Sequence, residues 1–236
     1  MDWLLAPIDL TRPHDLGPLL SWHGRVMTLA WGVMIPLGVL IARFYKIMPR
    51  QNWPVELDNR TWWWTHLGLQ QGASVLMVVG LALILLHGGE GAGQEAVIHR
   101  RIGWGILVVC ALQLLSGWLR GSKGGPDVEC ARRGDHYDMS WRRCLFERFH
   151  KTIGYSLILL AWYTILLGMW TANAPVWMWL CLGMWWIVLI AAFVILQSRG
   201  LAIDTYQAIY GPDDSHPGNR RPPIGWGVKR RPWEKE

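Results

Sequence analysis

Cysteine is scarce in this chain, and its four cysteines form no familiar pattern. Cys110 and Cys181 fall within apolar runs, whereas Cys130 and Cys144 fall in a polar segment that we expect to be a loop. The spacing excludes a disulfide framework and a zinc-binding pattern, and no C-x-x-C-H motif is present for covalent haem attachment. The chemistry of the protein must therefore rest on other residue types.

Charge is also scarce, because only 17% of the residues are charged while 52% are hydrophobic and the mean hydropathy is +0.17. The apolar residues gather in five runs, near residues 20–46, 61–87, 98–120, 148–172 and 175–198. Each run exceeds the roughly 20 helical residues that cross a bilayer, and spans in lipid must satisfy their own backbone hydrogen bonds. The sequence predicts an all-α integral membrane protein with five transmembrane helices, of which the first four form a bundle.

Positive charge is nearly absent from one side of the predicted topology. Of the 23 Lys and Arg residues, Arg12, Arg100 and Arg101 belong to one side, Arg25 lies within the first helix, and 19 belong to the other side. Positive loops stay in the cytoplasm, so we expect the amino terminus outside and the carboxyl terminus inside, in the cell inner (plasma) membrane. The distribution also explains the net charge of +6 without nucleic acid, and the basic tail is expected to face anionic lipids or a partner protein.

This topology divides the chain into three parts. We expect an outer amino-terminal segment at 1–19, a transmembrane domain at 20–198 and a cytoplasmic tail at 199–236. The first 19 residues carry a single basic residue, Arg12, and the apolar run after them is too long for a signal-peptide core, so we expect no cleavage.

Four histidines occur one per helix in the first four predicted spans, each expected near the start of its helix. They are His23, His66, His99 and His150. Ionisable rings at membrane depth are costly without a partner, so each one indicates a functional site. Consecutive helices alternate in direction, which places His23 with His99 on the outer side and His66 with His150 on the cytoplasmic side. Two imidazoles from facing helices suit a low-spin haem iron, so the sequence predicts two non-covalent b-type haems.

A glycine recurs at the far end of each of these helices, where a bound group needs room. The four glycines are Gly38, Gly80, Gly117 and Gly168. At 100° per residue each lies within about 60° of the histidine's face and ~21 to 27 Å away along the axis, near the level of the opposite haem. We expect close approach to the haems at these positions.

Basic residues beside the ligands are candidate partners for the anionic haem propionates. We expect Arg25, Arg100 and Arg101 to serve the outer haem, and Arg148 and Lys151 the cytoplasmic one.

His87 leaves one alternative open, because it lies at the outer end of the second helix and could replace His99 as partner of His23. His14, His136 and His216 lie in polar segments and are predicted to be solvated.

Other polar clusters have simpler explanations. The segment GSKGGP at 121–126 lacks the spacing of a phosphate-binding loop and follows a predicted membrane helix. The loop at 121–147 and the tail are rich in Gly, Pro and charge, which favours irregular structure. The acidic groups at 135–138 and 204–214 are expected to form turns and helix caps.

Four segments resemble the cytochrome b561 family. They are WHGRVMTLAWGVMIPLGVLIARF in the first helix, THLGLQ in the second, HRRIGWGILVVCALQLLSGWLRG in the third and FHKTIGYSLILLAW in the fourth. The likeness covers residues 20–172 and is strongest to the branch fused to extracellular DOMON domains, although this compact, bacterial-looking chain carries the core alone. The resemblance implies two b haems, ligated across helices one and three and across two and four, and electron transfer across the membrane.

We expect the chain to depart from this family in two respects, with no helix before the core, unlike classical members, and no DOMON domain. Ascorbate is the familiar donor in the family, yet Trp62, Trp63 and Trp64 lead up to His66 and suggest an apolar entrance suited to a quinone.

Three functions remain open at this stage. The first is an electron carrier, or the cytochrome subunit of a transmembrane oxidoreductase, that works with quinol or another small reductant. The second is a membrane-anchor or assembly subunit with structural haem. The third is a small transporter that uses the histidines as a proton or metal path.

Overall fold

The computed structural model describes residues 2–14, 16–89, 93–127 and 132–232. Cys130 lies outside these ranges. The described residues are mostly helical, and their only β-type pairings are two isolated bridges, Pro7 with Pro175 and Ile203 with Lys229. The prediction of an all-α protein is confirmed.

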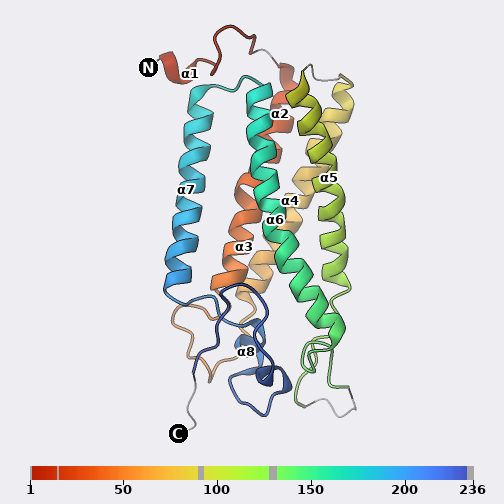
Figure 1. The fold of residues 1–236 in the computed structure, drawn as a ribbon, viewed down its shortest axis with the longest axis vertical. Helices are drawn as coiled ribbons and strands as arrows, with labels where there is room; N and C mark the ends of the chain where they lie inside the picture. The colour runs from red at the N-terminus through yellow and green to blue at the C-terminus, as the bar shows by residue number, and fades with distance from the viewer. Residues whose placement is uncertain (1, 15, 90–92, 128–131, 233–236) are drawn as a thin grey trace. The chain divides into compact units, whose positions relative to one another are not determined.

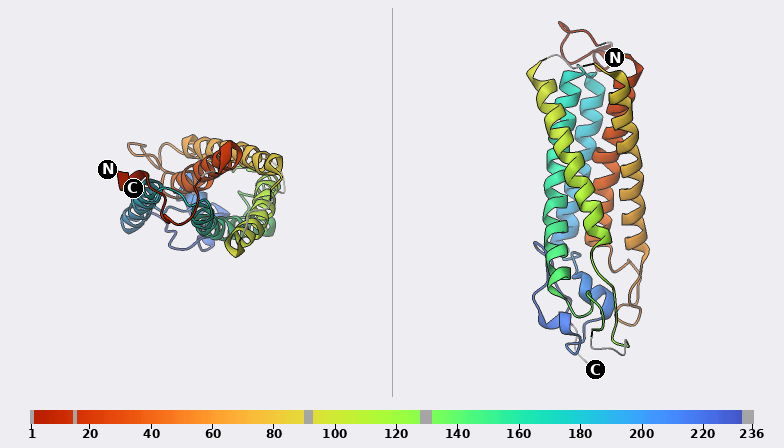
Figure 2. Two further views of the ribbon diagram at one scale, coloured as in Figure 1. Left: turned by 90° about the horizontal axis from the view of Figure 1, so that it is seen from above. Right: turned by 90° about the vertical axis from the view of Figure 1, so that its right-hand side faces the viewer.

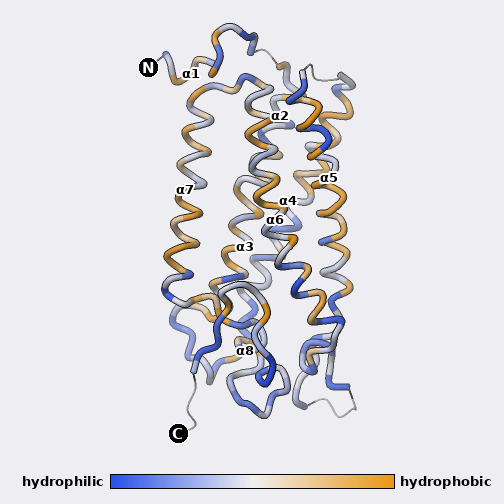
Figure 3. The backbone as a smooth tube through the Cα atoms, in the orientation of Figure 1, coloured by the Kyte–Doolittle hydropathy of each residue, from blue (hydrophilic) through white to orange (hydrophobic). Residues whose placement is uncertain are grey.

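Five helical spans are long and apolar enough to cross a membrane, as the sequence predicts (Figure 1). They are Gly17–Phe44, α4 (Thr61–His87), α5 (Gln94–Trp118), α6 (Trp141–Thr171) and α7 (Val176–Ser198). Coloured by hydropathy, α7 is hydrophobic along most of its length, whereas the segment after it is mostly hydrophilic (Figure 3).

The first span is not a regular helix. It consists of α2 (Gly17–Met27), a π-helical segment η1 (Thr28–Met34) and α3 (Ile35–Phe44). Pro36 has no N–H to give to the carbonyl of Gly32 four residues earlier, and the N–H of Ile35 instead bonds Ala30 O, five residues back. The freed Gly32 carbonyl accepts the indole N–H groups of Trp185 and Trp186 at 3.0 and 3.3 Å.

The start of α6 differs from the prediction, because the helix begins at Trp141 rather than near residue 148. The charges in its first turns interrupt the hydropathy signal, yet they stabilise the helix as ion pairs four residues apart. Arg143 pairs with Glu147 at 3.0 Å, and Lys151 pairs with Glu147 at 2.7 Å. Cys144 consequently lies on a helix and not in a loop.

The chain forms two compact units, and each is described by itself. Unit 1 comprises Met1–Gly38, Leu67–Val109 and Leu157–Ala192, and unit 2 comprises Val39–His66, Cys110–Ser156 and Phe193–Glu236. Within unit 1, the segments of α2, α4, α5 and α6 form a ring with α7 outside it (Figure 2). The amino-terminal segment, which includes the short helix α1 (Asp2–Leu5), is held by buried Asn173, whose side-chain amide donates to Asp9 O and Arg12 O at 2.8 and 2.9 Å.

Unit 2 contains an ordered tail where the sequence suggested irregular structure. The tail forms α8 (Thr205–Tyr210) and a 3-10 turn, η2 (Pro217–Arg220). Asp204 caps α8 by accepting from the backbone N–H of Tyr206, which confirms the capping role expected of this acidic group. A buried cluster joins the tail to the loop before α6, and its members are Tyr137, Met139, Tyr206, Tyr210 and Ile224.

Candidate functional site

His23 on α2 and His99 on α5 lie close together in unit 1, with ring centroids 6.3 Å apart and ring planes at 76° to each other. Each ring is held through Nδ1 by a backbone carbonyl. His23 Nδ1 lies 2.8 Å from Gly80 O on α4, and His99 Nδ1 lies 2.9 Å from Thr164 O on α6. The pair therefore receives support from four helical segments.

These carbonyl contacts determine which nitrogen of each ring is available. A carbonyl oxygen only accepts hydrogen bonds, so Nδ1 carries the proton in both His23 and His99. The Nε2 atom of each neutral ring then keeps a free lone pair, which is the form in which histidine binds a metal.

A second pair lies in unit 2, where His66 on α4 and His150 on α6 have ring centroids 6.5 Å apart and an interplanar angle of 79°. His150 also lies against Phe146, with ring centroids 5.1 Å apart. The expectation that His150 lies near the start of its helix is wrong, because α6 begins nine residues earlier, at Trp141.

Gln113 on α5 contacts this second pair. Its side-chain amide Nε2 donates to the backbone carbonyl of His150 at 3.1 Å, and only 7% of the residue is exposed. Two buried atoms at this contact, Gln113 Oε1 and His150 Nδ1, have no hydrogen-bond partner among the described residues. The amide oxygen of Gln113 accepts hydrogen bonds, and the ring nitrogen of His150 can donate one.

Both separations fit one metal ion held between two rings. A metal–imidazole bond is about 2.0–2.1 Å long and the ring centre lies about 1.1 Å behind the nitrogen, so two rings on opposite sides of one metal have centroids about 6.3 Å apart. The observed 6.3 and 6.5 Å match this value. No group of three or more His, Cys, Asp or Glu side chains that could hold a metal occurs within the described ranges. Each pair thus offers two nitrogen ligands, the number that haem iron takes from a protein in a bis-histidine site.

Two of the four predicted glycines touch the first pair. Gly80 contacts His23 through its carbonyl, and a Cβ built on Gly168 would lie 2.9 Å from His99 Cε1. Gly38 instead faces Gln70, whose Nε2 would lie 2.6 Å from an added Cβ. Gly117 has open space beside it, with no heavy atom of the described structure within 4 Å.

Sequence reasoning missed two further glycines, although a repeat in the sequence marks them. His99 and His150 both begin an H-x-x-x-G motif, which places Gly103 and Gly154 one helical turn after each histidine on the same face. A Cβ on Gly103 would meet no described atom within 4 Å, and one on Gly154 would meet only Gln113 Nε2, at 3.9 Å. Both glycines leave room beside a histidine for a bound group.

The predicted basic partners lie in varied surroundings. Arg25, Arg100, Arg101 and Arg148 are exposed, and the guanidinium of Arg25 lies 5.1 Å from the ring centre of Trp22. Lys151 is already engaged, because its ammonium donates to Glu147 at 2.7 Å and to Ile224 O at 2.8 Å. The ammonium of Lys151 is therefore already bound by two groups of the chain itself.

The remaining histidines differ in how far they are exposed. His87 is exposed at the end of α4, and His23 faces His99 rather than His87. His14 is exposed as predicted, and His216 is partly buried, with its Nδ1 2.9 Å from the hydroxyl of Tyr137. His136 corrects the prediction of a solvated residue, because only 2% of it is exposed.

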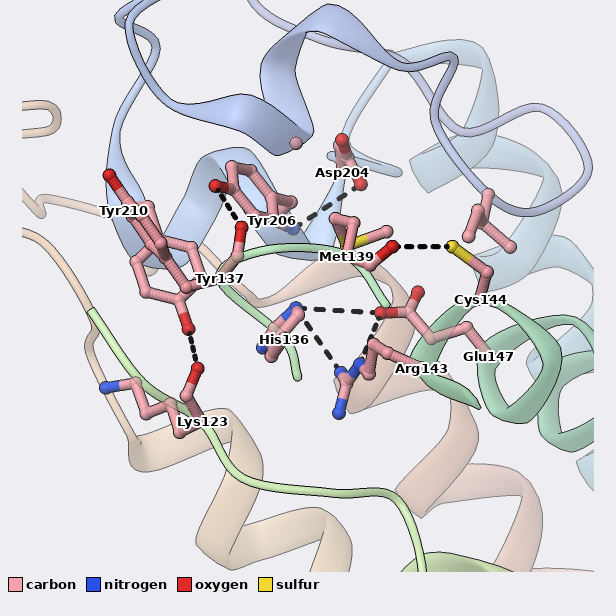
Figure 4. Close-up of polar contacts among 12 residues, drawn as sticks. Lys123, His136, Tyr137, Met139, Arg143, Cys144, Glu147, Asp204, Tyr206 and Tyr210 are labelled. Atoms are coloured by element: carbon pink, nitrogen blue, oxygen red, sulfur yellow. Dashed lines mark hydrogen bonds and ion pairs between the residues drawn. The ribbon is translucent and has the colours of Figure 1, made fainter. Parts of the chain in front are cut away.

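His136 belongs to a buried polar cluster in unit 2 that includes Arg143 and Glu147 (Figure 4). Its Nε2 lies 3.6 Å from Glu147 Oε1 and 3.4 Å from Arg143 Nη2, and its ring packs on Tyr206 and Tyr210. Burial, followed by the charge of Arg143, lowers the pKa of His136 to about 3, so the ring is neutral near pH 7. The loop before it is fixed by Asp135, which accepts from Ser140 Oγ at 2.8 Å and confirms the predicted turn-forming role.

The three tryptophans before His66 do not form a single apolar rim. Trp62 is buried at 9% exposure, whereas Trp64 is 60% exposed. The ring centroid of Trp63 lies 6.4 Å from that of His66, and the guanidinium carbon of Arg120 lies 4.2 Å from the centre of the Trp63 ring.

Comparison with known proteins shows the family to which the chain is similar. The family model described as eukaryotic cytochrome b561 matches residues 22–174. A cytochrome b561 and DOMON domain-containing protein of Arabidopsis thaliana is 28% identical over 147 residues, which cover 62% of this chain and 31% of the relative. Ferric-chelate reductase 1 of Bos taurus is 29% identical over 164 residues, covering 69% of this chain and 24% of the relative.

The chain therefore spans about a quarter to a third of the length of these relatives. No solved structure matches significantly.

Proposed function

Because the chain belongs to the cytochrome b561 family, we propose that it carries electrons across a membrane through two b-type haems. His23 and His99 would hold one haem, and His66 and His150 the other. When bound, haem supplies one-electron chemistry at its iron. The residues of the chain bind the iron, orient the ligand rings and exclude water.

The observation that carries this proposal is the matched geometry of the two histidine pairs. Four helices supply one ring each, and the centroid separations of 6.3 and 6.5 Å suit one metal per pair. In the first pair, the backbone contacts place the proton of each ring on Nδ1, so each Nε2 keeps the lone pair that would bind a metal. Gly80 and Gly168 contact the first pair, and Gly103 and Gly154 leave space one helical turn from a histidine, which would give a haem room to bind.

We further propose the membrane arrangement that the charge distribution favours. The segment 1–19 would lie outside, residues 20–198 would form the transmembrane domain and the tail 199–236 would lie in the cytoplasm, in a cell inner membrane. Arg220, Arg221 and Lys229 are exposed on the tail, which supports contact with anionic lipid headgroups.

The electron donor is proposed to be a quinol or another small reductant, and the acceptor a redox partner on the opposite face. The name of the ferric-chelate reductase relative adds a ferric chelate to the acceptors that deserve testing. The alternative is a membrane-anchor or assembly subunit with structural haem. The ordered tail, with Trp226 75% exposed beside its basic residues, supports that alternative by offering a surface for a partner protein.

The haem content of purified variants tests the proposal. A pyridine haemochrome assay should find two haems per wild-type chain and one per chain after His66→Ala or His99→Ala. His87→Ala is the matched control and should retain two haems, because His87 is exposed and His99 occupies the place facing His23. Folded wild-type protein without haem, or loss of both haems from a folded single variant, would contradict the proposal.

A further inference from the structure

Trp226 lies on the tail segment that follows η2 and is 75% exposed, although one side of its ring packs against a transmembrane helix. It stacks parallel to Phe193 on α7, with ring centroids 6.5 Å apart and an interplanar angle of 7°. Phe193 belongs to the last turns of α7, which ends at Ser198. The two residues after Phe193 on this helix, Val194 and Ile195, are 57% and 48% exposed. The indole therefore lies at the end of a helix surface that faces lipid.

The loop that carries Trp226 is held in place by three side chains of unit 2. Arg43, at the end of the first span and only 6% exposed, donates to the backbone carbonyl of Trp226 at 2.6 Å. Gln197 on α7 donates to Gly227 O at 2.9 Å. Lys151 on α6 donates to the carbonyl two residues before Trp226 at 2.8 Å. Side chains from three spans thus fix an exposed indole at the end of α7.

Exposed basic residues flank this indole. Arg199 follows α7 directly, and Lys229 follows Trp226 by three residues. The backbone N–H of Lys229 donates to Ala202 O at 2.9 Å, which holds this part of the tail close to the end of α7. An indole favours the membrane interface, where its ring lies in lipid and its N–H in the polar layer. Basic side chains at the same level attract anionic headgroups.

We propose that Trp226 inserts into the bilayer interface at this end of α7 and that Arg199 and Lys229 bind anionic lipid headgroups around it. The bilayer is the occupant that the structure favours, because the indole continues the lipid-facing surface of α7 and the flanking charges complement anionic lipid. The insertion deepens the proposed contact of the tail with lipid headgroups, and it does not depend on haem at either histidine pair.

Hydroxyl-radical footprinting of the full chain in lipid nanodiscs, read by peptide mass spectrometry, tests the insertion. Trp141 is the matched reference, because it is 77% exposed and begins α6 before the apolar run of that helix. In nanodiscs that contain phosphatidylglycerol, Trp226 should be oxidised several-fold more slowly than Trp141, because lipid covers it. Oxidation of both indoles at the same rate would overturn the inference and would leave Trp226 available to a soluble partner protein.

The lipid composition tests the role of charge. Replacing phosphatidylglycerol with phosphatidylcholine should raise the oxidation rate of Trp226, and Lys229→Gln should raise it in the anionic nanodiscs, because each change removes part of the attraction. Arg60→Gln, which replaces an exposed arginine before α4, is the control and should leave the rate unchanged. Gel filtration checks that each variant is folded. Equal rates in both lipids and in Lys229→Gln would overturn the role of the basic residues.

Haem content separates this inference from the proposed function. It should be the same in wild type, Lys229→Gln and Arg60→Gln. Wild-type protein that protects Trp226 but lacks haem would overturn the proposed function alone, whereas haem-loaded protein with an unprotected Trp226 would overturn the insertion alone.

Discussion

Gly168 shows how a single residue makes room for the ring of His99. A Cβ at this position would lie 2.9 Å from Cε1 and 3.2 Å from Nδ1 of His99, closer than packed atoms allow. We predict that Gly168→Ala displaces the ring, at a cost of about 1–3 kcal/mol, and weakens haem binding at the His23–His99 pair about tenfold or more. Haem content and the spectrum of that haem provide the measurement.

Gly183 on α7 is the control for this substitution, because an added Cβ there meets nothing within 4 Å. Gly183→Ala should leave both haems in place. Equal haem content in the two alanine variants would argue against a role for the space at Gly168.

Gln113 is predicted to tune the second pair. Gln113 contacts the backbone of His150 through Nε2, and its Oε1 and His150 Nδ1 are both buried without a hydrogen-bond partner among the described residues, so we predict that these two atoms pair when the site holds haem. An acceptor on Nδ1–H raises the basicity of a metal-bound imidazole, so Gln113→Leu should raise the midpoint potential of this haem and Gln113→Glu should lower it. Redox titration followed by absorbance measures both shifts.

The control for Gln113 is Gln94→Leu, at the exposed start of α5, which should leave the potential unchanged. Unshifted potentials in both Gln113 variants, with haem retained, would show that this side chain does not act on His150.

Sequence spacing predicts which histidines lie together in pairs but not what holds their rings. One histidine per helix and alternating helix directions pair His23 with His99. The Nδ1 acceptors are the backbone carbonyls of Gly80 and Thr164, which every residue type possesses. No residue type at those positions could have predicted these contacts.

Among the elements, the loop before α6 and the tail depend on a neutral, buried His136. Its pKa is lowered from 6.5 to about 3, so between these pH values the ring stays neutral in the folded protein but takes up a proton in the unfolded chain. The contribution of neutral His136 to the free energy of unfolding is therefore fully present above pH 6.5. It is lost as pH falls toward 3, by up to about 1.4 kcal/mol per pH unit. Urea unfolding between pH 6.5 and 5, followed by fluorescence, avoids the range in which ordinary carboxylates titrate.

The control for this pH effect is His136→Gln, which keeps a polar side chain but cannot titrate. Its unfolding free energy should vary less over the same range, even if its stability at pH 7 is lower. The groups around His136, namely Arg143, Glu147, Lys151 and Lys123, are unchanged in this variant. A slope equal to that of the wild type would contradict the assignment of the pH dependence to His136.

Apolar runs predict the existence of the five spans well, and errors concentrate where charge or proline alters the pattern. The charges of Arg143 and Glu147 concealed the first turns of α6, although their ion pair stabilises those turns. Pro36 is visible in the sequence, but the π-helical segment before it also depends on the indoles of Trp185 and Trp186, which lie about 150 residues away. The order of the tail likewise depends on distant contacts between Tyr206 and the loop at Tyr137.

At the scale of the whole molecule, family membership and two histidine pairs with a spacing that fits one metal ion each together support transmembrane electron transfer. The family establishes the link to b-type haem, and the pairs suggest how this chain would hold two of them. Neither identifies the donor or acceptor, because such partners are recognised by surfaces and charges that spacing alone does not encode.

Electron transfer in sealed liposomes tests whether the two histidine pairs carry electrons across the membrane. Wild-type protein is reconstituted with ferricyanide inside the vesicles, and quinol or ascorbate is added outside. We expect reduction of the enclosed ferricyanide by wild type and by His87→Ala. We expect its loss in both His99→Ala and His66→Ala, because each variant lacks one of the two haems that the electron must pass. Reduction that persists at the wild-type rate in His99→Ala or His66→Ala, or haem-loaded wild type that reduces nothing with any donor, would contradict transmembrane electron transfer through the two haems.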